Sequence, residues 1–174
     1  MSPHRITPAF LIAAGVVAVA ACTAPAASAP PPTASSGPPS PHVVLSGVSC
    51  ASARYCVAVG TEAAQGRTVP VAEAWDGRRW LGQRVPVPTG SAALSSPLDA
   101  VSCSSPSRCV AVGTSGTASS DVAYADSWNG TRWRLLPLSY PAGSTLLTGV
   151  SCRGSMCLLT GLYFSGGQEL PLAF

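Results

Sequence analysis

The sequence has no lysine and only two histidines, His4 and His42. Both histidines precede the part of the chain that we expect to fold. Nucleophilic catalysis of the Ser-His-Asp, Cys-His or Ser-Lys type needs a histidine or lysine to accept a proton from the nucleophile. These schemes are therefore excluded within the folded part, and so are metal sites built on histidine. We expect no catalytic residue, no metal and no cofactor in this chain.

Charge is also scarce, at 10% of the 174 residues. The ten cations are all arginines, and they stand against seven acidic residues. Binding of nucleic acid needs clustered cations and usually aromatic platforms on which bases stack. The weak excess of positive charge therefore predicts that nucleic acid is not a partner.

The first apolar run, residues 6–21, is too short for a membrane-spanning helix and has the length of a signal-peptide core. It ends in Val19-Ala20-Ala21-Cys22, which resembles the bacterial lipobox. In that motif small residues fit the peptidase cleft, and the cysteine thiol receives diacylglycerol. We predict a lipoprotein signal peptide over 1–21 and a membrane anchor through lipid on Cys22. The alternative is an ordinary signal peptide with an incidental cysteine, which would give a secreted protein.

Residues 22–42 consist of the lipidated cysteine and a stretch made almost wholly of Ala, Pro, Ser, Thr and Gly. Such a segment cannot bury enough apolar surface to offset its conformational entropy. We expect a disordered tether that holds the folded part away from the membrane.

The remainder, 43–174, repeats itself. After five intervening residues, Val48-Ser49-Cys50 is followed by Cys56-Val57-Ala58-Val59-Gly60. The pattern returns as Val101-Ser102-Cys103 with Cys109-Val110-Ala111-Val112-Gly113, and again as Val150-Ser151-Cys152 with Cys157-Leu158-Leu159-Thr160-Gly161. Repeats of this kind indicate an array of similar units.

Each unit has four short apolar pieces rich in Val and Trp and bounded by Gly, Pro, Ser and Asn, which predicts four β-strands. Asp76-Gly77 and Asn129-Gly130 each lie between two such pieces. These dipeptides favour two-residue type I′ turns. We therefore expect Trp75 to face Arg78, and Trp128 to face Thr131, as the closing pairs of two hairpins.

Four antiparallel strands per unit, with 53 residues from Cys50 to Cys103 and 49 from there to Cys152, are typical of β-propeller blades. Stacked blades bury both faces of a sheet, which explains why Val57-Ala58-Val59 lacks polar alternation. We predict an all-β, propeller-like array with one blade in 43–95, a second in 96–144 and a partial third in 145–174. The alternative is a β-sandwich, which would not need such similar repeats.

With Cys22 set aside, six cysteines remain, and they allow fifteen pairings in principle. A self-contained unit favours the local ones: Cys50 with Cys56, Cys103 with Cys109, and Cys152 with Cys157. Disulfides persist in the environment of an exported chain, and a loop this short gives about 2 kcal/mol of stability on the chain-entropy model. Zinc is disfavoured because the spacing is unusual and no histidine lies nearby.

The repeat resembles those of exported actinobacterial β-propeller-like proteins. The residues that carry the resemblance are Leu-x-x-Val-Ser-Cys, the Cys-Val-Ala-Val-Gly piece, and an acid before Trp-(Asp/Asn)-Gly-x-x-Trp, here Glu73 with Trp75 to Trp80 and Asp126 with Trp128 to Trp133. The resemblance covers 44–174 and implies a fold but no activity.

The third unit departs from this pattern, because the sequence ends before a third Trp-x-Gly turn. About eleven strands, or two and three-quarter blades, are expected, whereas a closed propeller has at least about four blades. We expect the sequence to be a fragment of a longer product. The alternative is self-association of several copies to close the ring.

The carboxylates Glu73 and Asp126 occupy equivalent places in two units, so we interpret them as framework residues that cap a turn or pair with an arginine, not as a glycosidase pair. The Trp-Asp-Gly-x-x-Trp turn is similar to the sialidase Asp-box only in its glycine-to-tryptophan spacing. A sialidase-like reading would rest on fold analogy alone.

Three arginines are candidates for ligand contact: Arg54, Arg108 and Arg153, one in each disulfide loop. At one rim of a propeller they could form a basic ring for an anionic glycan or cell-wall polymer. The alternative is that these arginines have no ligand and are present because each turn needs a solvated residue. We therefore expect an extracytoplasmic, membrane-anchored binding or scaffold module. The alternatives are part of a carbohydrate-processing enzyme with its active site elsewhere, and a purely structural wall-associated protein.

Overall fold

The computed structural model describes residues 42–64, 66–88, 95–116, 120–140 and 143–174. The predicted signal peptide 1–21, Cys22 and nearly all of the tether lie outside the described residues. Lipid attachment therefore stays a prediction.

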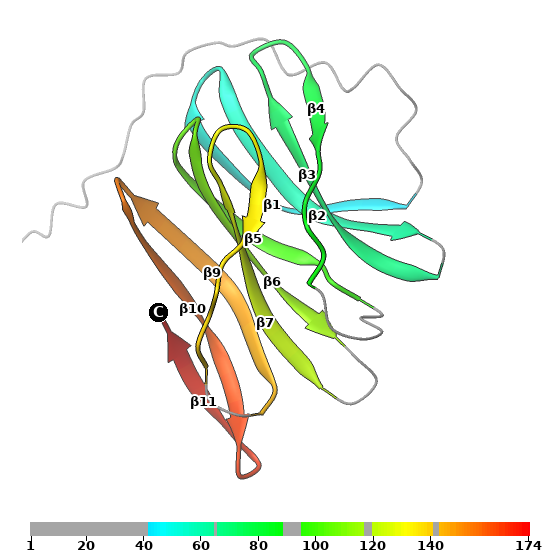
Figure 1. Cartoon of the computed structure of the whole chain (residues 1–174), viewed down its shortest axis with the longest axis vertical. Helices are drawn as coiled ribbons and strands as arrows, with labels where there is room; N and C mark the ends of the chain where they lie inside the picture. Colours follow the sequence, from blue (N-terminus) through cyan, green and yellow to red (C-terminus); the bar gives the residue numbers. More distant parts are fainter. Residues whose placement is uncertain (1–41, 65, 89–94, 117–119, 141–142) are drawn as a thin grey trace, which may run out of the picture.

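The described chain forms three antiparallel sheets, one for each repeat (Figure 1). We call them units I, II and III, and in each the strands pair in chain order. Unit I contains β1 (Val43–Ser52), β2 (Tyr55–Ala64), β3 (Arg67–Trp75) and β4 (Trp80–Gln83). Unit II contains β5 (Leu98–Ser105), β6 (Arg108–Gly116), β7 (Asp121–Trp128) and β8 (Trp133–Leu135). Unit III contains β9 (Thr145–Arg153), β10 (Met156–Ser165) and β11 (Gln168–Ala173).

The all-β prediction is confirmed: the described residues include eleven strands and no helix. It follows that no helix in this part of the chain is long and apolar enough to cross a membrane. The predicted ranges 43–95, 96–144 and 145–174 each hold one sheet.

The three sheets stack face to face, with their first strands side by side. β1 contacts β5, and β5 contacts β9 (Figure 1). The second strand of each unit also contacts the first strand of the next unit, since β2 packs on β5 and β6 packs on β9. Unit II therefore presents one face to unit I and the other face to unit III.

The hydrophobic core lies between the units. One cluster joins Val57 and Val59 of unit I to Leu98, Val101 and other residues of unit II. A second joins Val110 and Val112 of unit II to Leu147 and other residues of unit III. Val110-Ala111-Val112 lacks alternation because unit II is the middle sheet and is covered on both faces, as stacked layers require.

A β-bulge distorts the first strand of every unit at the same place. The register shifts between Leu45 and Gly47, between Leu98 and Ala100, and between Leu147 and Gly149. The strand opposite carries Gly60, Gly113 or Gly161, the last residue of the repeated Cys-Val-Ala-Val-Gly piece or its counterpart. A Cβ on any of these glycines would overlap a backbone carbonyl oxygen in or just before the first strand, that of Val44, Pro97 or Leu146. The repeated glycine is therefore required by a close approach of two backbones.

The predicted closing pairs of the hairpins are wrong. Trp75 faces Trp80, and Trp128 faces Trp133, so four residues separate each pair. The Asp76 N–H donates to the Arg79 carbonyl, which makes these two residues the ends of the turn and Gly77, at φ +91°, its first central residue. The turn is shifted by one residue because Asp76 Oδ1 accepts the N–H groups of Arg78 and Arg79 at 2.8 and 2.9 Å. Asn129 Oδ1 does the same for Thr131 and Arg132.

We predict that Gly113→Ala destabilises the protein by more than about 2 kcal/mol, because the methyl group can be accommodated only if the Pro97 backbone moves and the bulge is disturbed. Gly82→Ala is the control, since a Cβ there meets nothing within 4 Å. Urea unfolding of both variants measures the difference. Equal midpoints for the two variants would show that the close approach is not a constraint.

Candidate functional site

The strand directions bring five turns to one end of the stack. These are the turns β1–β2, β3–β4, β5–β6, β7–β8 and β9–β10, because antiparallel neighbours return every second turn to the same end. We call this end the disulfide rim. The β2–β3, β6–β7 and β10–β11 turns lie at the other end, the opposite rim. In Figure 1 the β9–β10 turn lies at the upper left and the β10–β11 turn at the bottom.

Three local disulfides hold the disulfide rim together: Cys50–Cys56, Cys103–Cys109 and Cys152–Cys157. Each joins directly opposed residues of the first two strands of a unit. These are the local pairings that the repeat predicts. Three intramolecular disulfides indicate an oxidising, extracytoplasmic environment.

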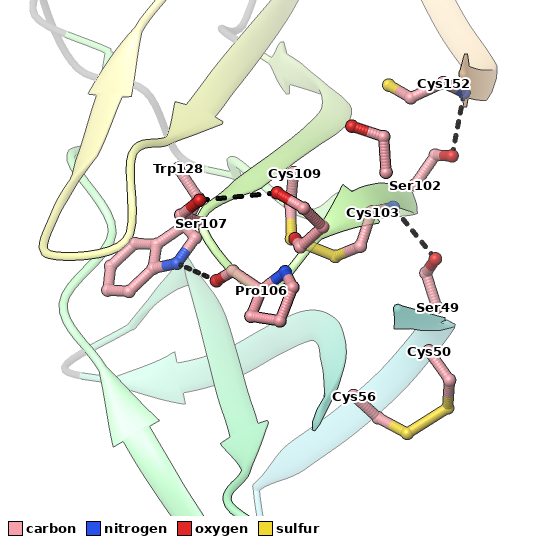
Figure 2. The surroundings of a disulfide bond; sticks show 12 residues. Ser49, Cys50, Cys56, Ser102, Cys103, Pro106, Ser107, Cys109, Trp128 and Cys152 are labelled. Carbon is pink, nitrogen blue, oxygen red and sulfur yellow. Dashed lines mark hydrogen bonds between the residues drawn. A yellow bond between two sulfur atoms is a disulfide. The ribbon is translucent and has the colours of Figure 1, made fainter. Parts of the chain in front are cut away.

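The repeated serine of Val-Ser-Cys links one disulfide to the next unit (Figure 2). Ser49 Oγ accepts the Cys103 N–H at 2.9 Å, and Ser102 Oγ accepts the Cys152 N–H at 2.9 Å. Between units II and III, Ser104 Oγ also donates to the Gly154 carbonyl at 2.8 Å. The three disulfide loops are thus adjacent and fixed relative to one another.

The predicted contact residues Arg54, Arg108 and Arg153 are all exposed at this rim. They do not occupy equivalent positions: Arg54 lies in the β1–β2 turn, Arg108 begins β6, and Arg153 ends β9. Arg108 Nη1 donates to the Gly154 carbonyl at 3.4 Å, so part of its role is to bridge two loops. Tyr55, which follows Arg54, packs against the core between units I and II and does not extend the exposed surface.

Three further arginines join the rim from the Trp-to-Trp turns. Arg78 and Arg79 lie in the β3–β4 turn and Arg132 in the β7–β8 turn, and all three are exposed. Sequence analysis did not select them, although their turns were recognised; strand order would have shown that both sets of turns share one end. Asp76 lies in the β3–β4 turn of this rim, and the half-buried Glu73 and the buried Asp126 lie two residues inside it on β3 and β7. Hydrogen bonds from the Arg79 and Arg78 backbone lower the pKa of Asp76, and its carboxylate lies 3.9 Å from Arg79 Nε.

The opposite rim has the reverse charge. Four acidic residues lie toward this end, where β2 ends and where β5, β7 and β11 begin: Glu62, Asp99, Asp121 and Glu169. Arg67, at the start of β3, is the cation found there among the described residues. The stack is therefore polarised, with six arginines at one end and four carboxylates at the other.

A cleft of about 680 Å³ opens between the outer strands of units I and II. Gln83, Arg84, Trp128 and Arg132 contribute to its lining. Trp133 also borders it but is only 4% exposed, and its Nε1 donates to Gln83 Oε1 across the two units at 2.7 Å. Trp133 therefore serves packing between units. The cleft is thus lined by two arginines and by Trp128.

The interpretation of Asp126 as a capping or ion-paired residue is wrong. Asp126 is fully buried, and neither carboxylate oxygen has a hydrogen-bond partner. It lies on β7 opposite Ala111, which belongs to the core between units I and II. Burial raises the pKa of Asp126 to about 7, because the apolar surroundings disfavour the charged form. Its counterpart Glu73 is half-buried and borders a different hollow on unit I.

We predict that the protein loses stability as the pH rises from about 4 to about 7. The folded state holds the Asp126 proton more tightly than the unfolded state, where the pKa is near 3.8. The free energy of unfolding therefore falls across this window and levels off above it. Thermal unfolding at pH 5 and pH 8 measures the effect.

Asp126→Asn should remove most of this pH dependence, whereas Glu169→Gln, an exposed control at the opposite rim, should not. Asp99, whose pKa is also raised by burial, leaves a remainder of the same sign. A wild-type protein that is equally stable at pH 5 and pH 8 would contradict the prediction.

Among the described residues, no group of three or more His, Cys, Asp or Glu side chains is arranged to hold a metal ion. No protein-family model and no curated protein matches the chain. Its function is therefore argued from its own residues.

Proposed function

We propose that this protein is a membrane-anchored extracytoplasmic lipoprotein whose three sheets are blades of a β-propeller-type array. The array serves as a binding or scaffold module, and its ligand is an anionic glycan or cell-wall polymer that contacts the disulfide rim.

The packing of the sheets supports the propeller arrangement. The first strands of the units are adjacent and therefore innermost, and each meander proceeds outward to a short last strand. Successive sheets bury equivalent residues against each other, since Leu98 and Leu147 are both fully buried at the same place of the repeat. In a propeller every blade contacts its neighbours in this way.

The proposed ligand is inferred from the opposite charges of the two rims. A rim with six exposed arginines and one exposed carboxylate attracts anions in a way that a mixed surface of the same net charge does not. The described chain begins at the opposite rim, where the His42 carbonyl accepts the Ala63 N–H. A tether that enters there directs the basic rim away from the membrane and toward polymers outside it.

We predict that the protein binds dextran sulfate and not neutral dextran, and that binding weakens as salt screens the rim. Replacing Arg54, Arg108 and Arg153 together by Gln should weaken binding about tenfold, since exposed charge pairs contribute a few tenths to about 1 kcal/mol each. Arg67→Gln, at the opposite rim, is the matched control. Calorimetry at two salt concentrations measures both.

If net charge and not the rim accounted for binding, Arg67→Gln would cost about one third of the binding free energy that the triple variant loses, because it removes one charge and not three. Thermal unfolding of the triple variant checks that loss of the Arg108 contact with Gly154 has not disturbed the loops.

We predict that the exported protein incorporates a fatty-acid probe at Cys22 and partitions with membranes. Cys22→Ser should abolish labelling and release the protein into the medium, whereas a Ser35→Ala control in the tether should change neither. Export of the wild-type protein without label would contradict the lipoprotein proposal but leave the folded module unaffected.

A further inference from the structure

The repeat defines two faces of a unit. The receiving face is the one that packs on the next unit along the chain, and the received face is the one that packs on the preceding unit. The receiving face carries the second-strand aliphatics Val57 and Val59 in unit I, and Val110 and Val112 in unit II; all four are nearly or fully buried. The received face carries Leu98 and Val101 in unit II, and Leu147 and Val150 in unit III. The two internal interfaces are thus built from the same repeat positions.

Among the described residues, one copy of each face is left uncovered, one on unit I and one on unit III. In unit I the received face is open: Leu45 is 47% exposed and Val48 is 64% exposed, whereas their counterparts Leu98 and Val101 are buried. In unit III the receiving face is open: Leu158, the counterpart of Val57 and Val110, is 55% exposed.

The open face of unit I is hollowed where a neighbour would fit. A hollow of about 290 Å³ is lined by residues of the bulge and of the strands beside it: Leu45, Ser46, Gly47, Val48, Ala58 and Trp80. In the internal interfaces, aliphatic side chains of the second strand of the preceding unit pack against the counterparts of these residues. Leu158 is the projecting aliphatic side chain that the other end of the stack supplies.

The residues that would form the same hydrogen bond between units are also exposed on units III and I, the acceptor residue on unit III and the donor residue on unit I. Ser49 and Ser102 each accept the N–H of the next unit's first half-cystine. Ser151, the corresponding acceptor of unit III, is exposed. Cys50, the corresponding donor position of unit I, is exposed as well.

We propose that the open face of unit III binds the open face of unit I of a second copy of this chain, so that two copies close one ring. Leu158 of each copy enters the hollow beside Val48 of the other, and Ser151 Oγ accepts the Cys50 N–H. Two copies of the three described sheets make six blades, within the range of about four to eight that closed propellers have. The two-fold axis then coincides with the ring axis, and both tethers leave from the same rim, as attachment to one membrane requires.

This inference rests on the propeller arrangement proposed above, and the experiment separates the two. The whole exported chain with Cys22→Ser, which carries no lipid, is measured by size-exclusion chromatography with light scattering. We expect twice the mass of one chain. Leu158→Asp and Val48→Asp should each give single chains, because either change spoils both contacts of the ring. Leu135→Asp is the matched control, since Leu135 is an exposed aliphatic residue on the middle unit, and it should stay dimeric.

Mixing the Leu158→Asp and Val48→Asp chains tests the head-to-tail geometry. One of the two contacts is intact in the mixed pair, so a heterodimer should form where neither variant dimerises alone. Any one of three results would overturn the proposal. These are a Leu158→Asp chain that is still dimeric, a mixture of the two variants that stays monomeric, and a wild-type chain that is monomeric at a concentration of about 100 micromolar.

Hydrogen exchange reports on the propeller arrangement independently. The Cys103 and Cys152 amides, bonded to Ser49 and Ser102, should be protected in every variant. A monomer with both amides protected would refute only the ring closure, whereas rapid exchange of these amides in the wild-type chain would refute the stacking of units on which the ring depends.

Discussion

The structure depends on one constraint: these sheets are apolar on both faces, so each needs a neighbour on both sides. In the middle sheet, Val110 and Val112 point toward unit III while Ala111 points toward unit I, and all three are buried. A strand of this kind cannot form a stable two-layer domain with a solvated outer face. It is stable only within a stack, where burial of each aliphatic side chain contributes about 1.5–3 kcal/mol. Repetition of the unit is therefore a physical necessity for this sequence.

Repetition in turn requires that each unit hold its own shape before its neighbours cover it. Two devices recur in every unit for this purpose. A bulge in the first strand approaches a glycine of the second so closely that no side chain fits between them, and this fixes the register. A disulfide then joins the same two strands at opposed positions, three residues beyond the bulge on the first strand. The serine before the first half-cystine carries this local order to the next unit through one hydrogen bond.

The parts of the fold that repeat could be predicted from the sequence, and the parts that depend on single side chains could not. Three copies of one pattern identified the strands, the units and the cysteine pairs, because each copy tests the others. The Trp-to-Trp turns were assigned to the wrong residues, since the Asp76 and Asn129 side chains accept backbone N–H groups and move the turn along by one. Asp126 was expected to have a polar partner. Its repeat position is instead a core position, where Glu73 remains partly solvated only because no unit precedes unit I in the described chain.

The candidate site, too, could be predicted from the sequence only in part. The sequence singled out Arg54, Arg108 and Arg153 because each lies between two half-cystines, but it missed Arg78, Arg79 and Arg132. The six converge because a four-stranded meander returns its first and third turns to the same end, and this follows from topology and not from motif. Topology also places the first described residue at the acidic end. If the ring closes about an axis that passes through both rims, every basic loop of every copy lies on one side and every tether on the other. A weakly charged chain thereby presents a multivalent cationic surface, whose affinity for a long polyanion grows with the number of loops that can engage at once.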